Sequence, residues 1–209
     1  MANIYHLLKY LARHTATDPR KHVTLWNAAQ TEWNTIKRTI AENRPITIHD
    51  PQERIVLVTD AATETSLGAC VIISPTGQLI TDSYYISKWQ HINDMEAQAL
   101  YKALDKFRHH MQYRIIHYLG DNTAVNHCLQ STHSKSFDLN MWIGRIIALT
   151  HNLRSRMTAQ YIRSEFNPAD PFTRRMKLGG HHIRVLHALS RFISTPASCR
   201  RRGVEVVKD

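Results

Sequence analysis

The chain contains little cysteine and no long apolar run. Its 209 residues include three cysteines, an odd number at wide spacing, so neither a disulfide framework nor a zinc site is predicted and the thiols are expected to be reduced. No apolar stretch approaches the roughly 20 residues that cross a bilayer, so we expect a soluble protein with no membrane partner. Internal repeats and low-complexity tracts are also lacking. The hydrophobic fraction of 43% nevertheless suffices for one main domain with appendages.

Positive charge is distributed unevenly along the chain. The formal net charge is +10, which favours a polyanionic partner. Residues 1–50 carry seven Lys/Arg against four Asp/Glu, residues 51–170 carry eleven of each, and residues 171–209 carry nine against two. The central segment is therefore neutral and both flanks are basic. This arrangement suits a nuclease, in which the flanks attract the backbone and an acidic centre holds metal.

Hydrophobic patterning in the central segment predicts an α/β domain. A continuous apolar run within residues 54–59 is typical of a strand buried on both faces. Two β-rich stretches, 67–74 and 78–87, flank the turn Pro75-Thr76-Gly77 and predict a hairpin. The remaining elements are helices over 93–111 with Asn93 as N-cap, 122–129 and 139–154, strands over 115–119 and 158–164, and a last helix from Asn167-Pro168. The predicted order is βββαβααβα.

Four carboxylates lie where these elements begin or end. Asp60 and Asp121 end predicted strands, and in open α/β sheets ligands bind beyond the carboxyl ends of strands. Asp170 stands three residues after Asn167 near the start of the last helix. An ordinary turn or capping role would explain any one of these three acids alone.

Glu96 is harder to explain as a surface acid. On a helical wheel it shares the apolar arc with Leu100 and Phe107. Asp94 and Asp105 fall on the opposite side, which predicts that they are solvated. A carboxylate on the inward face needs a partner such as a metal ion, because its desolvation costs several kcal/mol. The alternative is that Glu96 stands in the first turn of the helix only because the helix dipole favours an acid near the N-terminus.

The sequence around these acids resembles the four acidic motifs of ribonuclease H, and in particular the ribonuclease H domain attached to retroelement reverse transcriptases. The motifs are Thr59-Asp60-Ala61, Met95-Glu96-Ala97-Gln98-Ala99-Leu100, Gly120-Asp121-Asn122 and Asn167-Pro168-Ala169-Asp170-Pro171-Phe172-Thr173-Arg174. Two further stretches are similar to LTR/DIRS-type retrotransposons: His91-Ile92-Asn93 and Asp121-Asn122-Thr123-Ala124-Val125.

The resemblance implies an α/β, ribonuclease H-like fold. Its five-stranded mixed sheet would be flanked by helices and carry helical N- and C-terminal extensions. Residues 51–178 would form the catalytic domain, residues 1–50 a thumb- or connection-like helical extension, and residues 179–209 a basic C-terminal helix and tail.

The resemblance also implies a metal-dependent endonuclease that hydrolyses the RNA strand of RNA/DNA hybrids. Two Mg²⁺ ions about 4 Å apart, for which Mn²⁺ can substitute, would act on the scissile phosphate, and such hard cations prefer oxygen ligands to Cys or His. Four acids would hold the ions and carry the catalysis: Asp60, Glu96, Asp121 and Asp170. Four residues are candidates for substrate binding: Asn122, Thr123, Asn167 and Arg174. For Asn122 and Thr123, at a predicted helix N-terminus, plain capping is the alternative.

The chain departs from the family pattern at two loops and in its histidines. The stretch Ser164-Glu165-Phe166-Asn167 lacks the histidine that cellular and many retroviral members carry before the last acidic helix. Residues 131–138 form a short polar loop where some cellular enzymes have a basic handle helix. The fourteen histidines, which include His109-His110 and His181-His182, lack metal-ligand spacing and are expected to be solvated or to face nucleic acid.

The flanks suggest a link to a polymerase. Trp26, Trp33, Ile36-Lys37 and Arg44-Pro45-Ile46 resemble the thumb or connection region that precedes ribonuclease H in such enzymes. The chain has no adjacent Asp-Asp pair and should not synthesise DNA. It would then be a C-terminal fragment or a separately encoded piece of such an enzyme, with a polymerase region or subunit as its partner.

The C-terminal flank combines a helical pattern with a basic tail. Ile183, Leu186, Leu189 and Ile193 predict an amphipathic helix that packs on the domain, with Arg184 and Arg191 as a basic edge. The tail Cys199-Arg200-Arg201-Arg202-Gly203 predicts a backbone-binding arm, a localisation signal or a solvated tail. An intracellular site, nuclear or cytoplasmic, is expected, although the basic stretch 4–13 also allows organelle targeting.

Two other functions stay open. The first is an inactive ribonuclease H-like protein that binds nucleic acid or serves as a scaffold, against which the retention of all four acids argues. The second is a DDE-type integrase or transposase core, which shares the fold but uses three acids. The fourth acid, Asp170, argues against the second.

Overall fold

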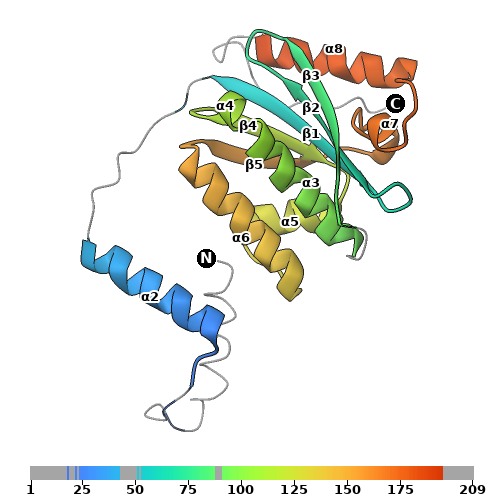
Figure 1. The fold of residues 1–209 in the computed structure, drawn as a ribbon. Coiled ribbons are helices and arrows are strands. Elements are labelled where there is room, and N and C mark those ends of the chain that lie inside the picture. Colours follow the sequence, from blue (N-terminus) through green and yellow to red (C-terminus); the bar gives the residue numbers. More distant parts are fainter. Residues whose placement is uncertain are drawn as a thin grey trace.

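The computed structural model describes residues 24–42, 53–87 and 91–194, together with Asp18, His22 and Pro51. Three stretches of interest in the sequence lie outside this part of the chain: residues 4–13, 44–46 and 199–203. At the centre is a five-stranded sheet in the order β3-β2-β1-β4-β5 (Figure 1). Both parallel and antiparallel pairs occur in it, which confirms the predicted five-stranded mixed sheet.

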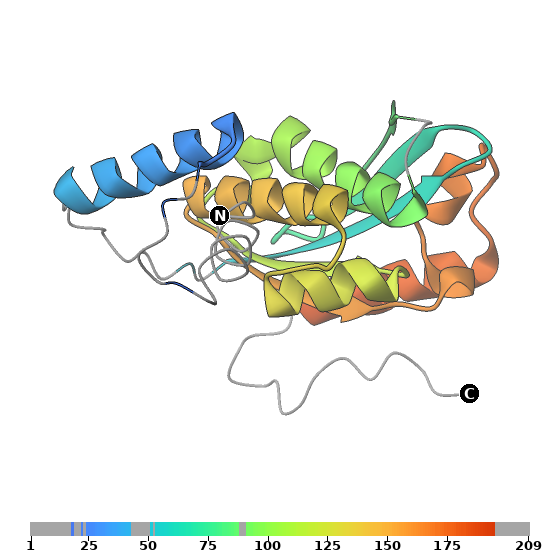
Figure 2. The same ribbon diagram turned by 90° about the horizontal axis from the view of Figure 1, so that it is seen from below.

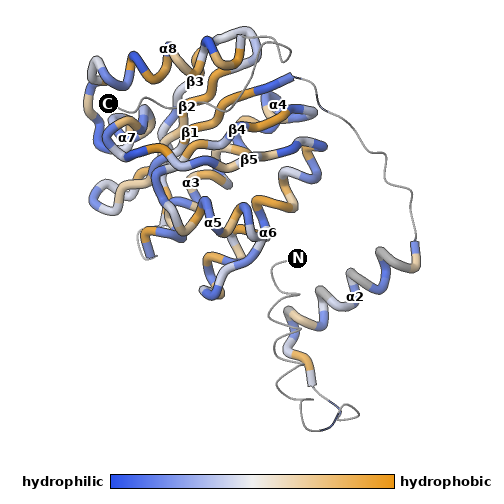
Figure 3. Tube along the Cα trace, turned by 180° about the vertical axis from the view of Figure 1, so that it is seen from behind, coloured by the Kyte–Doolittle hydropathy of each residue, from blue (hydrophilic) through white to orange (hydrophobic). Residues whose placement is uncertain are grey.

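The sheet is made of five strands. They are β1 (Arg54–Ala62), β2 (Leu67–Ile73), β3 (Leu79–Tyr85), β4 (Ile115–Gly120) and β5 (Arg156–Tyr161). β1 pairs antiparallel with β2 and parallel with β4, and β4 pairs parallel with β5. The central strands β1 and β2 are buried on both faces, as the continuous apolar run of β1 predicts for that strand. Figure 3 shows these strands as the hydrophobic centre of the trace.

Helices cover both faces of the sheet. Those around the sheet are α3 (Ile92–Lys106), α4 (Arg108–Met111), α5 (Thr123–Ser131), α6 (Phe137–Asn152), α7 (Asp170–Thr173) and α8 (Gly180–Ser194). α3 and α6 lie on one side and α8 on the other (Figure 2). Leu57, Leu100 and Ile143 belong to the core on the α3 and α6 side. Val58 and Leu189 belong to the core on the α8 side.

Several predicted boundaries are wrong. The helix predicted over 93–111 is two helices, because α3 ends at Lys106 and α4 begins at Arg108. Its N-cap is His91, whose Nδ1 accepts a hydrogen bond from the Asn93 N–H at 3.2 Å. The last acidic helix begins at Asp170. Asn167 has extended backbone angles, as expected of a residue that precedes proline.

The last predicted strand ends earlier than expected. β5 spans Arg156–Tyr161, and a short 3₁₀ turn, η1 (Ser164–Phe166), occupies the end of the predicted strand over 158–164. By contrast, the hairpin turn is confirmed: the Gly77 N–H donates to Ser74 O at 2.9 Å. Gly77 has a φ of 82°, a left-handed conformation that glycine adopts without strain.

The N-terminal flank contributes one described helix, α2 (Asn27–Glu42). Figure 1 shows it apart from the sheet, and its Trp33 side chain is exposed. Among the described residues, no helix combines the length and the hydrophobicity needed to cross a membrane.

Candidate active site

Three of the four predicted acids converge at one end of the sheet. Asp60 lies near the end of β1, Asp121 directly follows β4, and Glu96 comes from the first turns of α3. One carboxylate oxygen of each lies within 4.8 Å of those of the other two. The parallel register between β1 and β4 explains this convergence. Its last pair is Val58 with Leu119, so the residues that follow meet beyond the same edge.

Asp60 is enclosed by residues that follow β5. Its side chain is 4% exposed. Thr173 Oγ1 donates to Asp60 Oδ2 at 2.6 Å, and Asn167 Nδ2 lies 3.5 Å from Asp60 Oδ1. Burial raises the pKa of Asp60 from 3.8 to about 7, with Asp121 and Asp170 adding to the rise and the Thr173 hydrogen bond opposing it. Two residues from the far end of the chain therefore fix the orientation of this carboxylate.

Glu96 lies on the inward face of α3, as its place in the apolar arc predicts. Its side chain is 4% exposed. Oε1 accepts a hydrogen bond from the Ala61 N–H at 3.3 Å. Oε2 is buried and has no hydrogen-bond partner among the residues that the structure describes. Burial, followed by the nearby charges of Asp60 and Asp121, raises the pKa of Glu96 well above its usual value.

Asp94 was predicted to be a solvated surface acid, but it is buried. Only 6% of it is exposed. Burial raises the pKa of Asp94, and the charge of Asp138 at the start of α6 raises it further. α6 packs along α3 and covers the side of the helix that its own sequence pattern marks as solvated. Asp105, further along α3, is partly exposed and pairs with Arg108.

The N-terminus of α5 stands beside Asp121. Asn122 caps this helix, with its Oδ1 accepting from the Val125 N–H at 3.0 Å. Its Nδ2 donates to Asn93 Oδ1 at 2.9 Å and so links α5 to α3. Asp121 is half-buried, and its Oδ1 has no hydrogen-bond partner within the described part of the chain. Thr123 is exposed. The structure thus shows the capping role for Asn122 and leaves Thr123 at the surface.

Asp170 lies beside the other three acids but outside their cluster. Its Oδ1 accepts from Arg174 Nε at 2.6 Å. Its charge contributes to raising the pKa of Asp60, so the two carboxylates are close enough to interact. The predicted substrate residue Arg174 is therefore engaged with the fourth acid, with about half of its side chain exposed.

Asn167 is fully buried. Its Nδ2 donates to Thr59 O at 3.1 Å and approaches Asp60 Oδ1, and its own Oδ1 accepts from the Ala169 N–H at 3.0 Å. A side chain enclosed in this way offers no surface to a substrate. The prediction that Asn167 binds substrate is accordingly corrected, because the residue ties the loop before α7 to β1 and to Asp60.

The structure adds residues that the sequence analysis gave no role. Besides Thr173, these are Tyr118 and Gly120 on β4. Tyr118 is fully buried, and its Oη accepts from Thr59 Oγ1 at 3.3 Å. Burial raises the pKa of Tyr118, and the charge of Glu96 adds to this, so the phenol lies close to the acid cluster. A sequence signal existed for Gly120 and Thr173, because both stand inside the acidic motifs.

The pair His181-His182 also departs from the prediction. His182 was expected to be solvated or to face nucleic acid, but it is buried. Its Nδ1 accepts from the Gly179 N–H at 3.0 Å, and its Nε2 lies 3.1 Å from His181 Nε2. Burial lowers the pKa of His182, and the neighbouring His181 lowers it further. The pair contributes to the start of α8. His109 and His110 are exposed.

Comparison with known proteins finds the same fold. No family model and no curated protein matches this sequence. Among solved structures, LC11-RNase H1 in complex with an RNA/DNA hybrid is 19% identical with a TM-score of 0.50, covering 59% of this chain and 96% of that chain. The N-terminal RNase H domain of rv2228c from Mycobacterium tuberculosis, solved as a fusion with maltose-binding protein, is 16% identical with a TM-score of 0.51, covering 59% and 98%. The chain has a ribonuclease H-like fold.

A third solved structure is longer than this chain. Prototype foamy virus protease-reverse transcriptase is 15% identical with a TM-score of 0.38, covering 76% of this chain and 22% of that chain.

The ribonuclease H-like fold itself accounts for the position of the acids, since it places the ends of β1 and β4 next to the start of α3.

The donor atoms of the cluster fit a hard divalent cation. All three clustered side chains are carboxylates, the ligand type that Mg²⁺ and Mn²⁺ prefer. Two of their oxygens, Glu96 Oε2 and Asp121 Oδ1, are buried and accept no hydrogen bond from the described residues. Buried polar atoms are normally paired, and a cation would pair with both. The arrangement can therefore hold a metal ion.

Proposed function

We propose that this protein is a metal-dependent endonuclease that hydrolyses the RNA strand of RNA/DNA hybrids and that it derives from a retroelement reverse transcriptase. The observation that carries the proposal is the convergence of Asp60, Glu96 and Asp121 at the end of the β1–β4 pair in a ribonuclease H-like fold. One protein that shares this fold, LC11-RNase H1, has been solved in complex with an RNA/DNA hybrid. The acidic motifs of the sequence supply the link to retroelements.

In this proposal the three clustered acids would hold Mg²⁺, and Asp170, here paired with Arg174, would complete the set. Bound Mg²⁺ supplies a Lewis acid that stabilises charge on the phosphate and activates water. Asp60 would have to be ionised to hold the ion, and burial raises its pKa to about 7, so binding of a cation near neutral pH would release a proton. The Ala61 N–H orients Glu96, and Thr173 with Asn167 orients Asp60.

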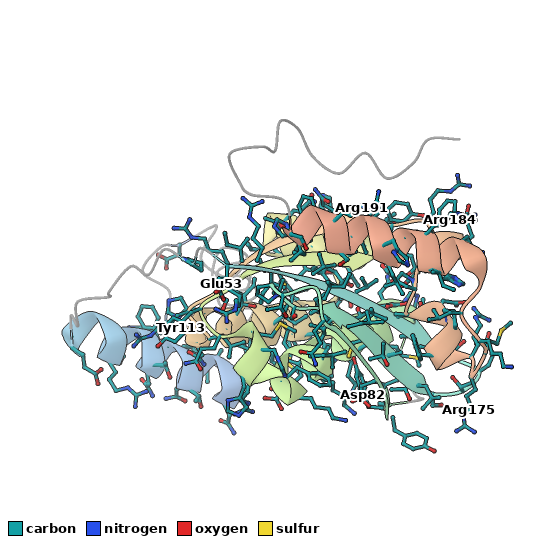
Figure 4. All side chains as sticks on the ribbon, turned by 90° about the horizontal axis from the view of Figure 1, so that it is seen from above. Glu53, Asp82, Tyr113, Arg175, Arg184 and Arg191 are labelled. Carbon is teal, nitrogen blue, oxygen red and sulfur yellow. The ribbon has the colours of Figure 1, made fainter. Side chains whose placement is uncertain are left out.

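Substrate contacts are proposed for the exposed members of the predicted set. Thr123 stands at the N-terminus of α5, where backbone N–H groups favour a phosphate. Arg174 is half-exposed beside Asp170. Selectivity for RNA would come from contacts to its 2′-hydroxyl groups. Arg184 and Arg191 follow the outer side of α8 (Figure 4) and would attract the backbone at longer range. A polymerase region or subunit is proposed as partner of the N-terminal flank, which exposes Trp33 on α2.

One observation favours the second candidate function, an inactive protein that binds nucleic acid or serves as a scaffold. The fourth acid, Asp170, is paired with Arg174 and stands outside the three-acid cluster. If this ion pair persists when substrate binds, the site keeps an affinity for metal and nucleic acid without full catalytic power. A cleavage assay separates the two functions.

The test uses labelled RNA/DNA hybrid, double-stranded RNA and double-stranded DNA, each with Mg²⁺ and then with EDTA. We expect cleavage of the hybrid alone, abolished by EDTA. Asp60→Asn should lower the rate by about 100-fold or more, the usual effect of removing one preorganised electrostatic group. Asp105→Asn is the matched control, because it removes an acid that lies outside the cluster and pairs with Arg108. Its rate should equal that of the wild type.

Each alternative has its own outcome in this assay. Binding of the hybrid without cleavage supports the scaffold function. Cleavage of double-stranded DNA alone supports an integrase-like core. Hybrid cleavage that persists in Asp60→Asn, or in EDTA, contradicts the proposed mechanism.

A further inference from the structure

We propose that Thr173 is a positioning residue whose hydroxyl holds the Asp60 carboxylate in the orientation needed to bind metal. This proposal rests on the proposed metal-dependent function. Thr173 contacts neither substrate nor metal in this role and acts only through Asp60. The supporting observations are the hydrogen bond between the two side chains, their shared burial and the anchoring of α7.

The hydrogen bond is short and lies within the protein interior. Thr173 is 0% exposed, and its Oγ1 donates to Asp60 Oδ2 at 2.6 Å. The same Oγ1 lies 2.8 Å from the backbone oxygen of Asp170. A hydroxyl has a single proton to donate, and a bond to a carboxylate is stronger than one to a neutral carbonyl. The Thr173 hydroxyl therefore donates its hydrogen bond to ionised Asp60.

The bond leaves a defined part of the carboxylate available. An ionised carboxylate offers about four lone-pair sites. Thr173 occupies one on Oδ2, and Asn167 Nδ2 approaches Oδ1 at 3.5 Å. One Asp60 oxygen also lies within 4.8 Å of oxygens of Glu96 and Asp121, so the lone pairs that Thr173 and Asn167 do not occupy are available to a cation held by these three acids. Without the hydroxyl the carboxylate could rotate about its terminal torsion, which is soft in Asp.

α7 is itself fixed against the sheet, which makes Thr173 a rigid support. Thr65 Oγ1, in the turn between β1 and β2, donates to Thr173 O at 2.9 Å. Pro171 in the same helix is buried. The single turn of α7 is thus attached to the sheet at both its backbone and its side chains. Partners that orient a metal ligand in this manner typically contribute 10- to 100-fold, as an order of magnitude, to metal affinity.

The experiment compares Thr173→Val, which keeps the shape but loses the hydroxyl, with Thr173→Ser, which keeps the hydroxyl. Mn²⁺ and Mg²⁺ affinities of the full chain are measured by isothermal titration calorimetry without nucleic acid. We expect Thr173→Val to bind metal roughly 10- to 100-fold more weakly than the wild type, and Thr173→Ser to stay close to the wild type. Thr150→Val is the matched control, because Thr150 is buried and bonds to Ile146 O inside α6, a helix on the other face of the sheet. It should leave the affinity unchanged.

Melting in EDTA shows separately whether each variant folds, and Thr173→Ala provides a second hydroxyl-free variant if Thr173→Val does not. Wild-type affinity in both hydroxyl-free variants, or equal weakening in Thr173→Ser and Thr173→Val, overturns the positioning role while leaving the proposed function intact. A wild-type protein that binds neither Mn²⁺ nor Mg²⁺ overturns the proposed function, and the role of Thr173 in metal binding with it.

Discussion

At the scale of single residues, the contact between Gly120 and Tyr118 explains why glycine precedes Asp121. A Cβ atom at position 120 would lie 2.2 Å from Tyr118 Oη and 2.8 Å from its Cζ. The phenol cannot move aside easily, because Tyr118 is fully buried under the acid cluster. Gly120 is therefore required for space, and the ring that it accommodates supports the end of β4 from which Asp121 extends.

Gly120→Ala should destabilise the fold. We expect a loss of about 1–3 kcal/mol in the free energy of unfolding, the usual effect of overpacking a rigid core, measured by urea denaturation. Gly180→Ala at the start of α8 is the control, since its Cβ would meet only Arg184 Nη1 at 4.0 Å. That change should stay within about 0.5 kcal/mol of the wild type. Equal effects of the two substitutions would show that Tyr118 yields to the added methyl group.

At the scale of elements, local patterns predicted most strands and helices. The features that the sequence did not predict depend on contacts between segments that are distant along the chain. The burial of β1 and the inward position of Glu96 follow from the pattern of residues within one element. Asp94 was misjudged because its cover comes from α6, an element formed more than 40 residues later in the chain. The bond between Thr173 and Asp60 joins residues 113 positions apart, and no local pattern contains that information.

α8 shows the same division within one helix. Its apolar spacing predicted a packing face that includes Ile183 and Leu189, but Leu189 is 2% exposed and Ile183 is 46% exposed. Leu189 packs into the core with Val56 and Val58 of β1. Ile183 instead borders a shallow surface hollow with Leu79 of β3. The helix pattern gives the direction of the apolar face, and the extent of the sheet beneath decides which residues are covered.

Leu189→Ala and Ile183→Ala test this difference. Leu189→Ala should lower the free energy of unfolding by about 2–5 kcal/mol, as for other truncations of buried leucine. Ile183→Ala should change it by about 0.5 kcal/mol or less, as for a surface site. Both are measured by urea denaturation at the same pH. A small loss for Leu189→Ala would mean that α8 does not share the core of the sheet.

At the scale of the whole molecule, the basic residues of the C-terminal segment contrast with the buried cluster of three acids. The described residues that follow Asp170 include five bases and no Asp or Glu: Arg174, Arg175, Lys177, Arg184 and Arg191. Figure 4 shows Arg175, Arg184 and Arg191 on the outside of the molecule. Asp60, Glu96 and Asp121, by contrast, converge at the end of the sheet, where like charges repel. The metal-free protein should therefore gain stability from any proton or cation that neutralises the cluster.

The stability of the metal-free protein should accordingly fall as pH rises from about 4 to about 7. The pKa of Asp60 is raised from 3.8 to about 7, so the folded state binds more protons than the unfolded state in this range and the free energy of unfolding decreases with pH. The full effect is on the order of 4 kcal/mol, measured by urea denaturation in EDTA at a series of pH values. Glu96 acts in the same direction, because its pKa is raised too.

His182 acts in the opposite direction, because burial lowers its pKa and the stability it confers is lost as pH falls below the ordinary histidine value of about 6.5. Asp60→Asn separates the two effects, since it removes the Asp60 charge and leaves His182 unchanged. The variant should show a smaller loss of stability between pH 4 and 7 than the wild type, with the remaining loss due to Glu96. Saturating Mg²⁺ should likewise raise the free energy of unfolding of the wild type near pH 7, because a ligand that binds only the folded state stabilises it. Parallel pH profiles for wild type and Asp60→Asn would mean that Asp60 does not carry its charge in a buried acid cluster.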